Sequence, residues 1–254
     1  MTPASPDTPA PTAPAADAAP REVAPGVVVR GPAPPPLQHF GLVAFDMDST
    51  LISIECIDEI ADAAGRKAEV AAITEAAMRG EIADYAESLA RRLALLRGVP
   101  AEALEAVYTQ RLALNPGVEA FVAACREAGL RTLLVSGGFT FFADRVKARL
   151  RLDFARANVL EVEGGRLSGR LVPRPWGTVV DGAEKRRVLL ELAELLGLPA
   201  ERCIAVGDGA NDLPMMSAAG CSIAFHAKPA VRERARVSVQ QGGLDQALLA
   251  FGIT

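Results

Sequence analysis

Three short apolar runs, each followed directly by acids or by a glycine-containing loop, constrain the fold of this chain more than any other feature. They occupy residues 41–45, 130–135 and 203–206. Continuous apolar runs of this length are typical of strands that are buried on both faces of a parallel sheet. Segments with helical periodicity lie between them, at residues 117–128, 139–150 and 183–196. Strands that alternate with helices predict an α/β fold with a doubly wound, mostly parallel sheet.

Polar side chains follow each of the three runs. Asp46 comes just after the first, Ser136 after the second and Asp208 after the third. In a doubly wound fold, ligands bind beyond the carboxyl ends of the strands. We therefore expect these three side chains to meet at one edge of the sheet.

The segment between the first two strands is too long to be a simple connection. Residues 54–112 contain some four helical segments, which are broken at Gly65, at Gly80 and at residues 98–100. This pattern predicts a helical cap at 54–112, inserted into a core made of residues 37–53 and 113–254. Residues 161–172 alternate around Gly164 and Gly165, which predicts a small β-hairpin with no chemical role.

The first 36 residues differ from the rest in composition. They hold eleven of the 18 prolines and almost no large apolar side chains. A segment of this kind cannot bury a core, so we expect residues 1–36 to form a disordered tail.

Charge and cysteine content exclude several classes of function. The formal net charge is -4 and there is no basic run, so nucleic acid is not an expected partner. No apolar stretch approaches the roughly 20 residues of a membrane-spanning helix, so we expect no membrane association. The four cysteines form no CxxC pair, which predicts neither a zinc site nor disulfides and fits a cytoplasmic protein. The oligomeric state stays open between monomer and homodimer.

Two acidic motifs follow the first and third strands. Asp46 and Asp48 lie two residues apart, an arrangement in which one carboxylate can attack or bind a metal while the other handles protons. Asp208, Asn211 and Asp212 lie in a glycine-containing turn and offer the hard oxygen ligands that Mg²⁺ prefers. The alternative is that both motifs are plain turns, with Asp48 and Asp212 acting as helix N-caps.

A third motif and one lysine complete the pattern. Ser136, Gly137 and Gly138 stand before a helix, where a hydroxyl and backbone N–H groups form an anion site; the alternative is an ordinary turn. Lys185 shares the apolar stripe of its helix with Val188, and a lysine facing inward needs an anionic partner. Carboxylates, Mg²⁺, a lysine and backbone donors together predict a phosphoryl-transfer site.

From residue 41 to the C-terminus, the chain resembles the haloacid dehalogenase-like hydrolases, and within them the phosphoserine phosphatase family. The resemblance is carried by DMDSTL at 46–51 with Glu55, AMRG at 77–80, SL at 88–89, RL at 92–93, VGDGANDLPMM at 206–216 and AFHAKP at 224–229. It implies a Rossmann-like core and hydrolysis of O-phosphoserine, a small phosphate ester, through a phosphoaspartate, as the last step of serine biosynthesis.

The resemblance also implies roles for single residues of the core. Asp46 would be the nucleophile and Asp48 the proton donor and acceptor. Mg²⁺ would be held by Asp46, the backbone carbonyl of Asp48, and Asp208, with Asp212 orienting that shell. The phosphoryl oxygens would be bound by Ser136, the Gly137 backbone and Lys185, while Asn211 would orient the metal shell together with Asp212 and contribute to substrate binding.

In the cap, the resemblance implies that Glu55 pairs with the substrate ammonium and Arg92 with its carboxylate, while Met78 and Tyr85 form the substrate wall. Arg92 lies seven residues beyond Tyr85 and shares its helix face, although an arginine that reaches from the cap core to water has the same spacing. The alternative for Glu55 is favourable interaction with a helix dipole. Tyr85 stands where a phenylalanine is common in the family.

Three other functions remain open for the same residues. A phosphotransferase would pass the phosphoryl group to another alcohol, such as homoserine. A related phosphatase would act on a different small phosphate ester. A scaffold that binds phosphoserine without turnover would need neither the nucleophile nor the metal ligands, and this sequence has both.

Overall fold

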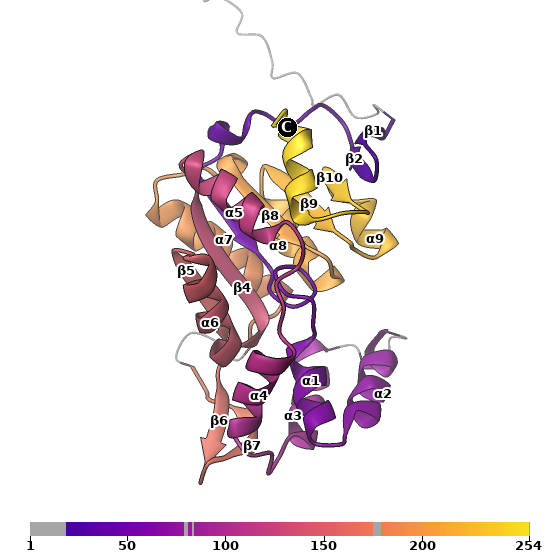
Figure 1. Cartoon of the computed structure of the whole chain (residues 1–254), viewed down its shortest axis with the longest axis vertical. Coiled ribbons are helices and arrows are strands. Elements are labelled where there is room, and N and C mark those ends of the chain that lie inside the picture. Colours follow the sequence, from indigo (N-terminus) through magenta and orange to yellow (C-terminus); the bar gives the residue numbers. More distant parts are fainter. Residues whose placement is uncertain (1–18, 79–80, 83, 175–178, 254) are drawn as a thin grey trace, which may run out of the picture.

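The computed structural model describes residues 19–78, 81–82, 84–174 and 179–253. It contains a sheet of eight strands in the order β1-β2-β10-β9-β8-β3-β4-β5 and a separate two-stranded hairpin, β6-β7. Figure 1 shows the sheet with its helices in the upper part of the molecule, and a separate group of helices together with the hairpin at the lower end.

Parallel strands form the centre of the main sheet. β3 (Leu42–Phe45) lies between β4 (Arg131–Phe139) and β8 (Cys203–Gly207), and the sheet continues to β5 (Phe154–Asn158) on one side and to β9 (Cys221–Phe225) and β10 (Val237–Val239) on the other. The predicted α/β class with a mostly parallel sheet is therefore confirmed. The apolar runs are continuous because helices cover both faces of these strands.

The two faces of β3 divide the core into two layers. Val43 and Phe45 pack with residues of α5 (Val118–Glu127), α6 (Thr140–Leu150) and η4 (Leu244–Phe251). Leu42 and Ala44 pack with α7 (Gly182–Leu195), α8 (Leu213–Ala218) and α9 (Pro229–Arg232). Alternate side chains of a strand point to opposite faces, so a four-residue strand contributes to both cores. Two short 3-10 turns, η1 (Leu37–His39) and η2 (Ala200–Arg202), precede β3 and β8.

The described residues of the predicted insertion form four helices. They are α1 (Cys56–Ala63), α2 (Lys67–Met78), α3 (Tyr85–Leu95) and α4 (Glu102–Gln110). The chain leaves and re-enters the core side by side, because Ile52 and Leu114 form an antiparallel bridge. The two chain segments that connect these helices to the core therefore lie next to each other, close to the end of β3.

The predicted hairpin consists of β6 (Leu160–Glu163) and β7 (Arg166–Leu171), and it packs against the cap. The backbone of Leu167 donates to the carbonyl of Val99 and accepts from the N–H of Gly98, both at 2.8 Å. Ala101 N–H donates to the carbonyl of Gly165 at 2.9 Å. Although it comes from the core part of the sequence, the hairpin is bonded to the loop between α3 and α4 (Figure 1).

The expected disordered tail is corrected over part of its length. β1 (Arg21–Ala24) and β2 (Val27–Val29) form a hairpin around Gly26, which has a φ of 75°. β2 pairs antiparallel with β10, and Val27 and Val29 are fully or almost fully buried. The high proline content concealed a run of three valines at residues 27–29, which covers a sheet edge that would otherwise be unpaired. Residues 1–18 lie outside the described part of the chain.

Within the described residues, no helix is long and apolar enough to cross a membrane.

Candidate active site

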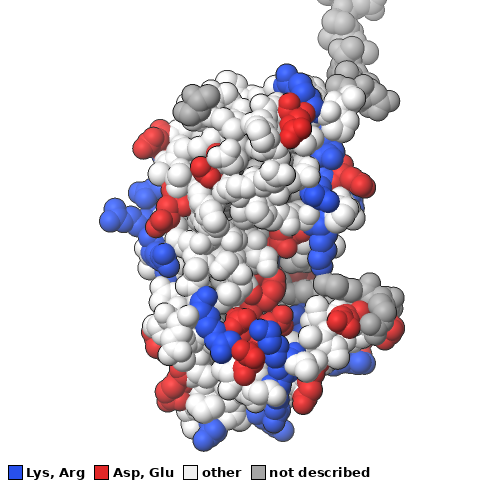
Figure 2. Space-filling view, turned by 45° about the vertical axis from the view of Figure 1, so that its right-hand side comes forward, with Lys and Arg blue, Asp and Glu red and all other residues white. Residues whose placement is uncertain are grey.

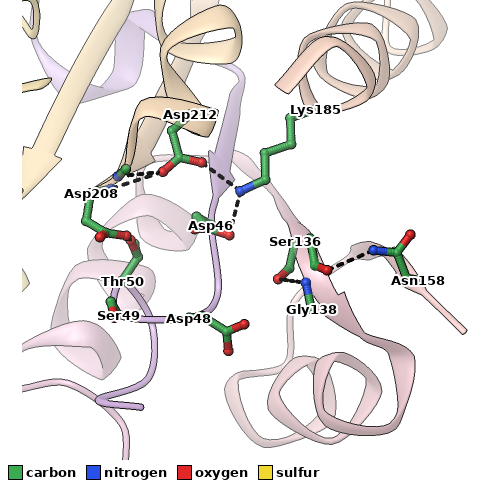
Figure 3. A network of polar contacts seen from close by, with 12 residues as sticks. Asp46, Asp48, Ser49, Thr50, Ser136, Gly138, Asn158, Lys185, Asp208 and Asp212 are labelled. Atoms are coloured by element: carbon green, nitrogen blue, oxygen red, sulfur yellow. Dashed lines mark hydrogen bonds and ion pairs between the residues drawn. The ribbon is translucent and has the colours of Figure 1, made fainter. Parts of the chain in front are cut away.

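A buried lysine between two aspartates lies at the centre of the site (Figure 3). Asp46 follows β3, and Lys185 lies in the first turn of α7. Lys185 Nζ is 2.7 Å from Asp46 Oδ1 and 2.7 Å from Asp212 Oδ1, and the lysine is fully buried. Burial lowers the pKa of this ammonium, but the two carboxylates outweigh that effect and raise its pKa above the ordinary value. Lys185 therefore carries a permanent positive charge beside Asp46.

Asp212 is held in place by both of its carboxylate oxygens. Oδ1 bonds to Lys185, while Oδ2 accepts hydrogen bonds from the backbone N–H groups of Asp208 at 3.1 Å and Gly209 at 3.0 Å. A Cβ at Gly207 would lie 2.5 Å from the Asp212 carboxylate, so this close approach requires glycine. Asp212 thereby fixes both the turn after β8 and the position of Lys185.

Three carboxylates gather at this edge of the sheet in a way that suits a metal ion. Oxygens of Asp46, Asp208 and Asp212 lie within 4.8 Å of one another. Burial, followed by the negative charge of Asp212, raises the pKa of Asp46 well above its usual value and that of Asp208 to about 7. A hard divalent cation would relieve this repulsion, and carboxylate oxygens are the ligands such cations prefer. The residues present therefore fit a metal site.

Asp48 lies on the other side of Asp46, facing the Ser136 segment (Figure 3). Burial, followed by the charge of Glu55, raises its pKa to about 7. Its Oδ1 accepts a hydrogen bond from the N–H of Cys56, the first residue of α1, at 3.4 Å. A carboxyl with this pKa can both give and take a proton near neutral pH.

The predicted phosphate-binding segment extends β4 and does not form a turn. Ser136, Gly137 and Gly138 belong to this strand, and α6 begins at Thr140. Ser136 Oγ accepts a hydrogen bond from the N–H of Gly138 at 2.9 Å, and Ser136 is almost fully buried. The pairing of β4 with β5 is irregular after Val135 and resumes at Phe139, so the segment departs from a regular strand just before α6.

Asn158 holds this segment in place, a contact that the sequence did not reveal. Its Nδ2 donates to the carbonyl of Gly137 at 2.8 Å, and its Oδ1 accepts from the N–H of Val180 at 2.9 Å. One buried amide thus connects the glycine segment with the approach to α7, which carries Lys185 (Figure 3). The only signal in the sequence is a polar residue at the end of a strand.

Asn115 was missed in the same way, and Thr50, although part of the DMDSTL motif, was given no role of its own. Asn115 Nδ2 lies 3.2 Å from the carbonyl oxygen of Ser49, 2.9 Å from that of Thr50 and 3.0 Å from that of Ile52. Thr50 Oγ1 donates to Asp208 Oδ1 at 3.1 Å. Ser49 has a φ of 57°, and its Oγ donates to Glu55 Oε1 at 2.7 Å. These bonds fix the loop that places Asp46, Asp48 and Glu55.

A cavity of about 1110 Å³ joins the cap to the core. Most of the predicted site residues line it, namely Asp46, Asp48, Glu55, Tyr85, Arg92, Ser136, Gly137, Asp208 and Asn211. Lys185 and Asp212 lie behind Asp46 and are both fully buried. The side chain of Met78, at the end of α2, lies outside the described residues.

On the cap side, the helix spacing orients two neighbouring arginines differently. Arg92 lines the cavity, and its Nε donates to the carbonyl of Ser88 at 3.4 Å. Arg91 is exposed and pairs with Glu87. Figure 2 shows acidic and basic side chains close together in the lower half of the view, whereas in the upper half charged side chains lie mainly towards the edges and the middle is largely uncharged.

Comparison with known proteins agrees with this geometry and defines the class. Residues 43–217 match the model of the haloacid dehalogenase-like hydrolases. A protein of Albidiferax ferrireducens named phosphoserine phosphatase is 61% identical over 233 residues, which are 91% of this chain and 98% of that protein. A phosphoserine phosphatase of a Polaromonas species is 60% identical over 90% of this chain and 98% of its own length.

A solved structure supports the same assignment. It is described as the phospho-aspartyl intermediate analogue of a phosphoserine phosphatase, and it matches with a TM-score of 0.75 and 36% identity over 82% of this chain and 97% of that one. The chain therefore belongs to the phosphoserine phosphatase family of the haloacid dehalogenase-like hydrolases.

Proposed function

We propose that this protein hydrolyses O-phosphoserine to serine and phosphate through a phosphoaspartate at Asp46. One observation carries the proposal: the Asp46 carboxylate lies 2.7 Å from the buried Lys185 ammonium and opens into a cavity that Arg92 and Glu55 also line. The family assignment and the solved phospho-aspartyl analogue support the same chemistry.

Two displacements at phosphorus account for the reaction. Asp46 attacks the phosphorus and forms a new P–O bond, while the bond to the serine oxygen breaks and Asp48 gives that oxygen a proton. Water then attacks the phosphoaspartate, and Asp48 takes the proton of the water. Phosphate leaves, and Asp46 is free for the next cycle.

The metal ligands that we propose are those that the family resemblance implies. We assign Mg²⁺ to Asp46, the backbone carbonyl of Asp48, and Asp208. When bound, the ion neutralises charge on the phosphoryl oxygens. Asp212 stays outside this set, because its two oxygens already bond to Lys185 and to the backbone of the turn.

The remaining residues bind the substrate. Ser136, the Gly137 backbone and Lys185 take the phosphoryl oxygens, Asn211 contributes to substrate binding, and Tyr85 forms part of the wall beside the substrate. Glu55 pairs with the ammonium and Arg92 with the carboxylate, for which a planar guanidinium is well suited. The cap, residues 54–112, thus recognises the amino-acid part of the substrate, while the core carries out phosphoryl transfer.

The test is phosphate release from phosphoserine, phosphothreonine, phosphotyrosine, phosphoethanolamine and sugar phosphates, with and without Mg²⁺. Asp46→Asn abolishes turnover if Asp46 is the nucleophile. Arg92→Ala removes the preference for phosphoserine, whereas Arg91→Ala, a matched change on the exposed face of the same helix, retains it. Full activity of Asp46→Asn would refute the mechanism, and a flat substrate profile would refute the substrate.

A phosphotransferase is the second candidate, because the cavity has room for an acceptor alcohol beside the phosphoaspartate. Adding homoserine and detecting a phosphorylated product separates transfer from hydrolysis. We also propose a cytoplasmic location and a place at the end of serine biosynthesis. The four buried free cysteines support a reducing compartment.

A further inference from the structure

The hydroxyl of Tyr85 touches the phosphate-binding segment from the cap side. Tyr85 is the first residue of α3, and a Cβ placed on Gly137 would lie 2.2 Å from Tyr85 Oη and 3.3 Å from its Cζ. No side chain larger than hydrogen fits at position 137 while the tyrosine occupies this place. The cap and the core therefore meet at this hydroxyl.

This hydroxyl lacks a hydrogen-bond partner among the side chains and backbone groups that the structure describes. Tyr85 lines the cavity together with Gly137, Asp48 and Arg92. Polar groups in such places are satisfied by ligand or by water. Burial raises the pKa of the phenol above its ordinary value, so the group keeps its proton and acts as a donor.

The surroundings decide which part of a ligand accepts this bond. Gly137 lies in the segment that takes the phosphoryl oxygens in the function proposed above. Arg92, seven residues along α3 and so on the same helix face, takes the carboxylate of the substrate in the same proposed function. One helix then presents a neutral donor to the phosphoryl group and a guanidinium to the carboxylate.

We propose that the Tyr85 hydroxyl donates a hydrogen bond to a phosphoryl oxygen of the bound substrate, so that the cap itself takes part in phosphate recognition. The identity of the substrate rests on the proposed function, but recognition of a phosphoryl group does not require it to be phosphoserine. Where phenylalanine replaces this tyrosine, the contact is absent.

Tyr85→Phe removes this hydroxyl and leaves the ring, and Tyr108→Phe is the matched control. Tyr108 is the only other tyrosine of the chain, lies in α4 and is not part of the cavity lining. A hydrogen bond to a charged oxygen corresponds to a roughly tenfold or larger change in binding. We expect inorganic phosphate to inhibit Tyr85→Phe at least about tenfold more weakly, with inhibition by serine unchanged and Tyr108→Phe like wild type.

An unchanged inhibition constant for phosphate in Tyr85→Phe would overturn the proposal, and so would an equal loss for serine. If the wild type did not hydrolyse phosphoserine, the proposed function would fail by itself. Calorimetric binding of inorganic phosphate with Mg²⁺ to the same three proteins would still test the hydroxyl.

A second comparison tests the contact itself. A methyl group at position 137 conflicts with the hydroxyl at 2.2 Å but meets the ring carbon at 3.3 Å. Gly137→Ala combined with Tyr85→Phe should therefore bind phosphate better than Gly137→Ala alone. If the losses of phosphate affinity in the two single variants simply added up in the double variant, the hydroxyl would not lie against Gly137 as the structure places it.

Discussion

At the scale of single residues, Lys185 decides how the site is held together. An unpaired ammonium inside a protein is very unfavourable, and so are two buried carboxylates without a counter-charge. Here one lysine neutralises Asp46 and Asp212, and Asp212 in turn fixes the turn after β8. The stability of this region and the position of the nucleophile therefore depend on the same charge.

Replacing Lys185 should lower the free energy of unfolding by an amount that depends on pH. Lys185→Met leaves two buried carboxylates facing each other, which should lower the free energy of unfolding by about 3–5 kcal/mol at pH 8. The loss should shrink at pH 5, because the raised pKa of Asp46 allows that carboxyl to take up a proton. Urea denaturation without metal measures both. Arg186→Met, an exposed position on the same helix, is the control, and an equal loss there would contradict this account.

The raised pKa of Asp208 predicts that the stabilising effect of a metal ion depends on pH. Its pKa of about 7, raised by burial and then by Asp212, exceeds the unfolded value of about 3.9. Without metal, its contribution to stability is therefore complete below about pH 4 and is lost as the pH rises through 7. Mg²⁺ should raise the melting temperature more at pH 8 than at pH 5.5, since protons compete with the ion. Asp208→Asn should flatten this difference, and an equal gain at both pH values would argue against a metal at this carboxylate.

The sequence identified the chemical side chains better than their supports. Asp46, Asp48 and Asp208 follow apolar strands, and the ends of parallel strands meet at one edge, so their meeting could be predicted. Asn115 and Asn158 could not, because both bond to backbone groups of segments that only the folded chain brings near. Sequence patterns reveal burial and period, but they do not show which carbonyl a distant amide will reach.

At the scale of elements, the β1-β2 hairpin and the cap show where patterns succeed and fail. The helical segments of the insertion were visible because breaks at Gly65, Gly80 and residues 98–100 divide it and because α3 carries an apolar stripe. β5, β9 and β10 were not identified, and β2 was hidden inside a proline-rich stretch. Strands of three to five residues offer too few positions to be distinguished by alternation alone.

The buried face of β2 predicts a stability effect far from the active site. Val29 is almost fully buried and pairs with Val237, whereas Val28 is only partly buried. Val29→Ala should lower the free energy of unfolding by about 2 kcal/mol, with little change in kcat. Val28→Ala should change it by less than about 0.5 kcal/mol. Urea denaturation and phosphate release on the two variants measure these effects, and identical curves would mean that this strand is not packed in solution.

At the scale of the whole molecule, the cavity lies between two parts of the chain. Core residues such as Asp46 and cap residues such as Arg92 line the same space. Closure of the cap over a bound substrate would exclude bulk water from the phosphoaspartate, and we expect the cap to open again before the products leave. Opening is therefore expected to limit turnover.

This expectation can be measured with a viscogen. If opening is rate-limiting, kcat for phosphoserine should fall nearly in proportion to the relative viscosity of added sucrose. Asp48→Asn, in which proton transfer is slow, serves as the control and should show almost no dependence on viscosity. A wild-type rate that is also independent of viscosity would place the slow step in the chemistry.

The hairpin on the cap has a consequence for exchanging parts between relatives. The insertion at 54–112 looks like a module that a chimaera could replace as one block. Yet Gly98 and Val99 form backbone hydrogen bonds with Leu167, which lies in β7, outside the insertion and after β5 in the sequence. A chimaera that replaces the cap would therefore also need β6 and β7 from the same relative. The exchanged unit would consist of two separate segments of the chain, the insertion and the hairpin.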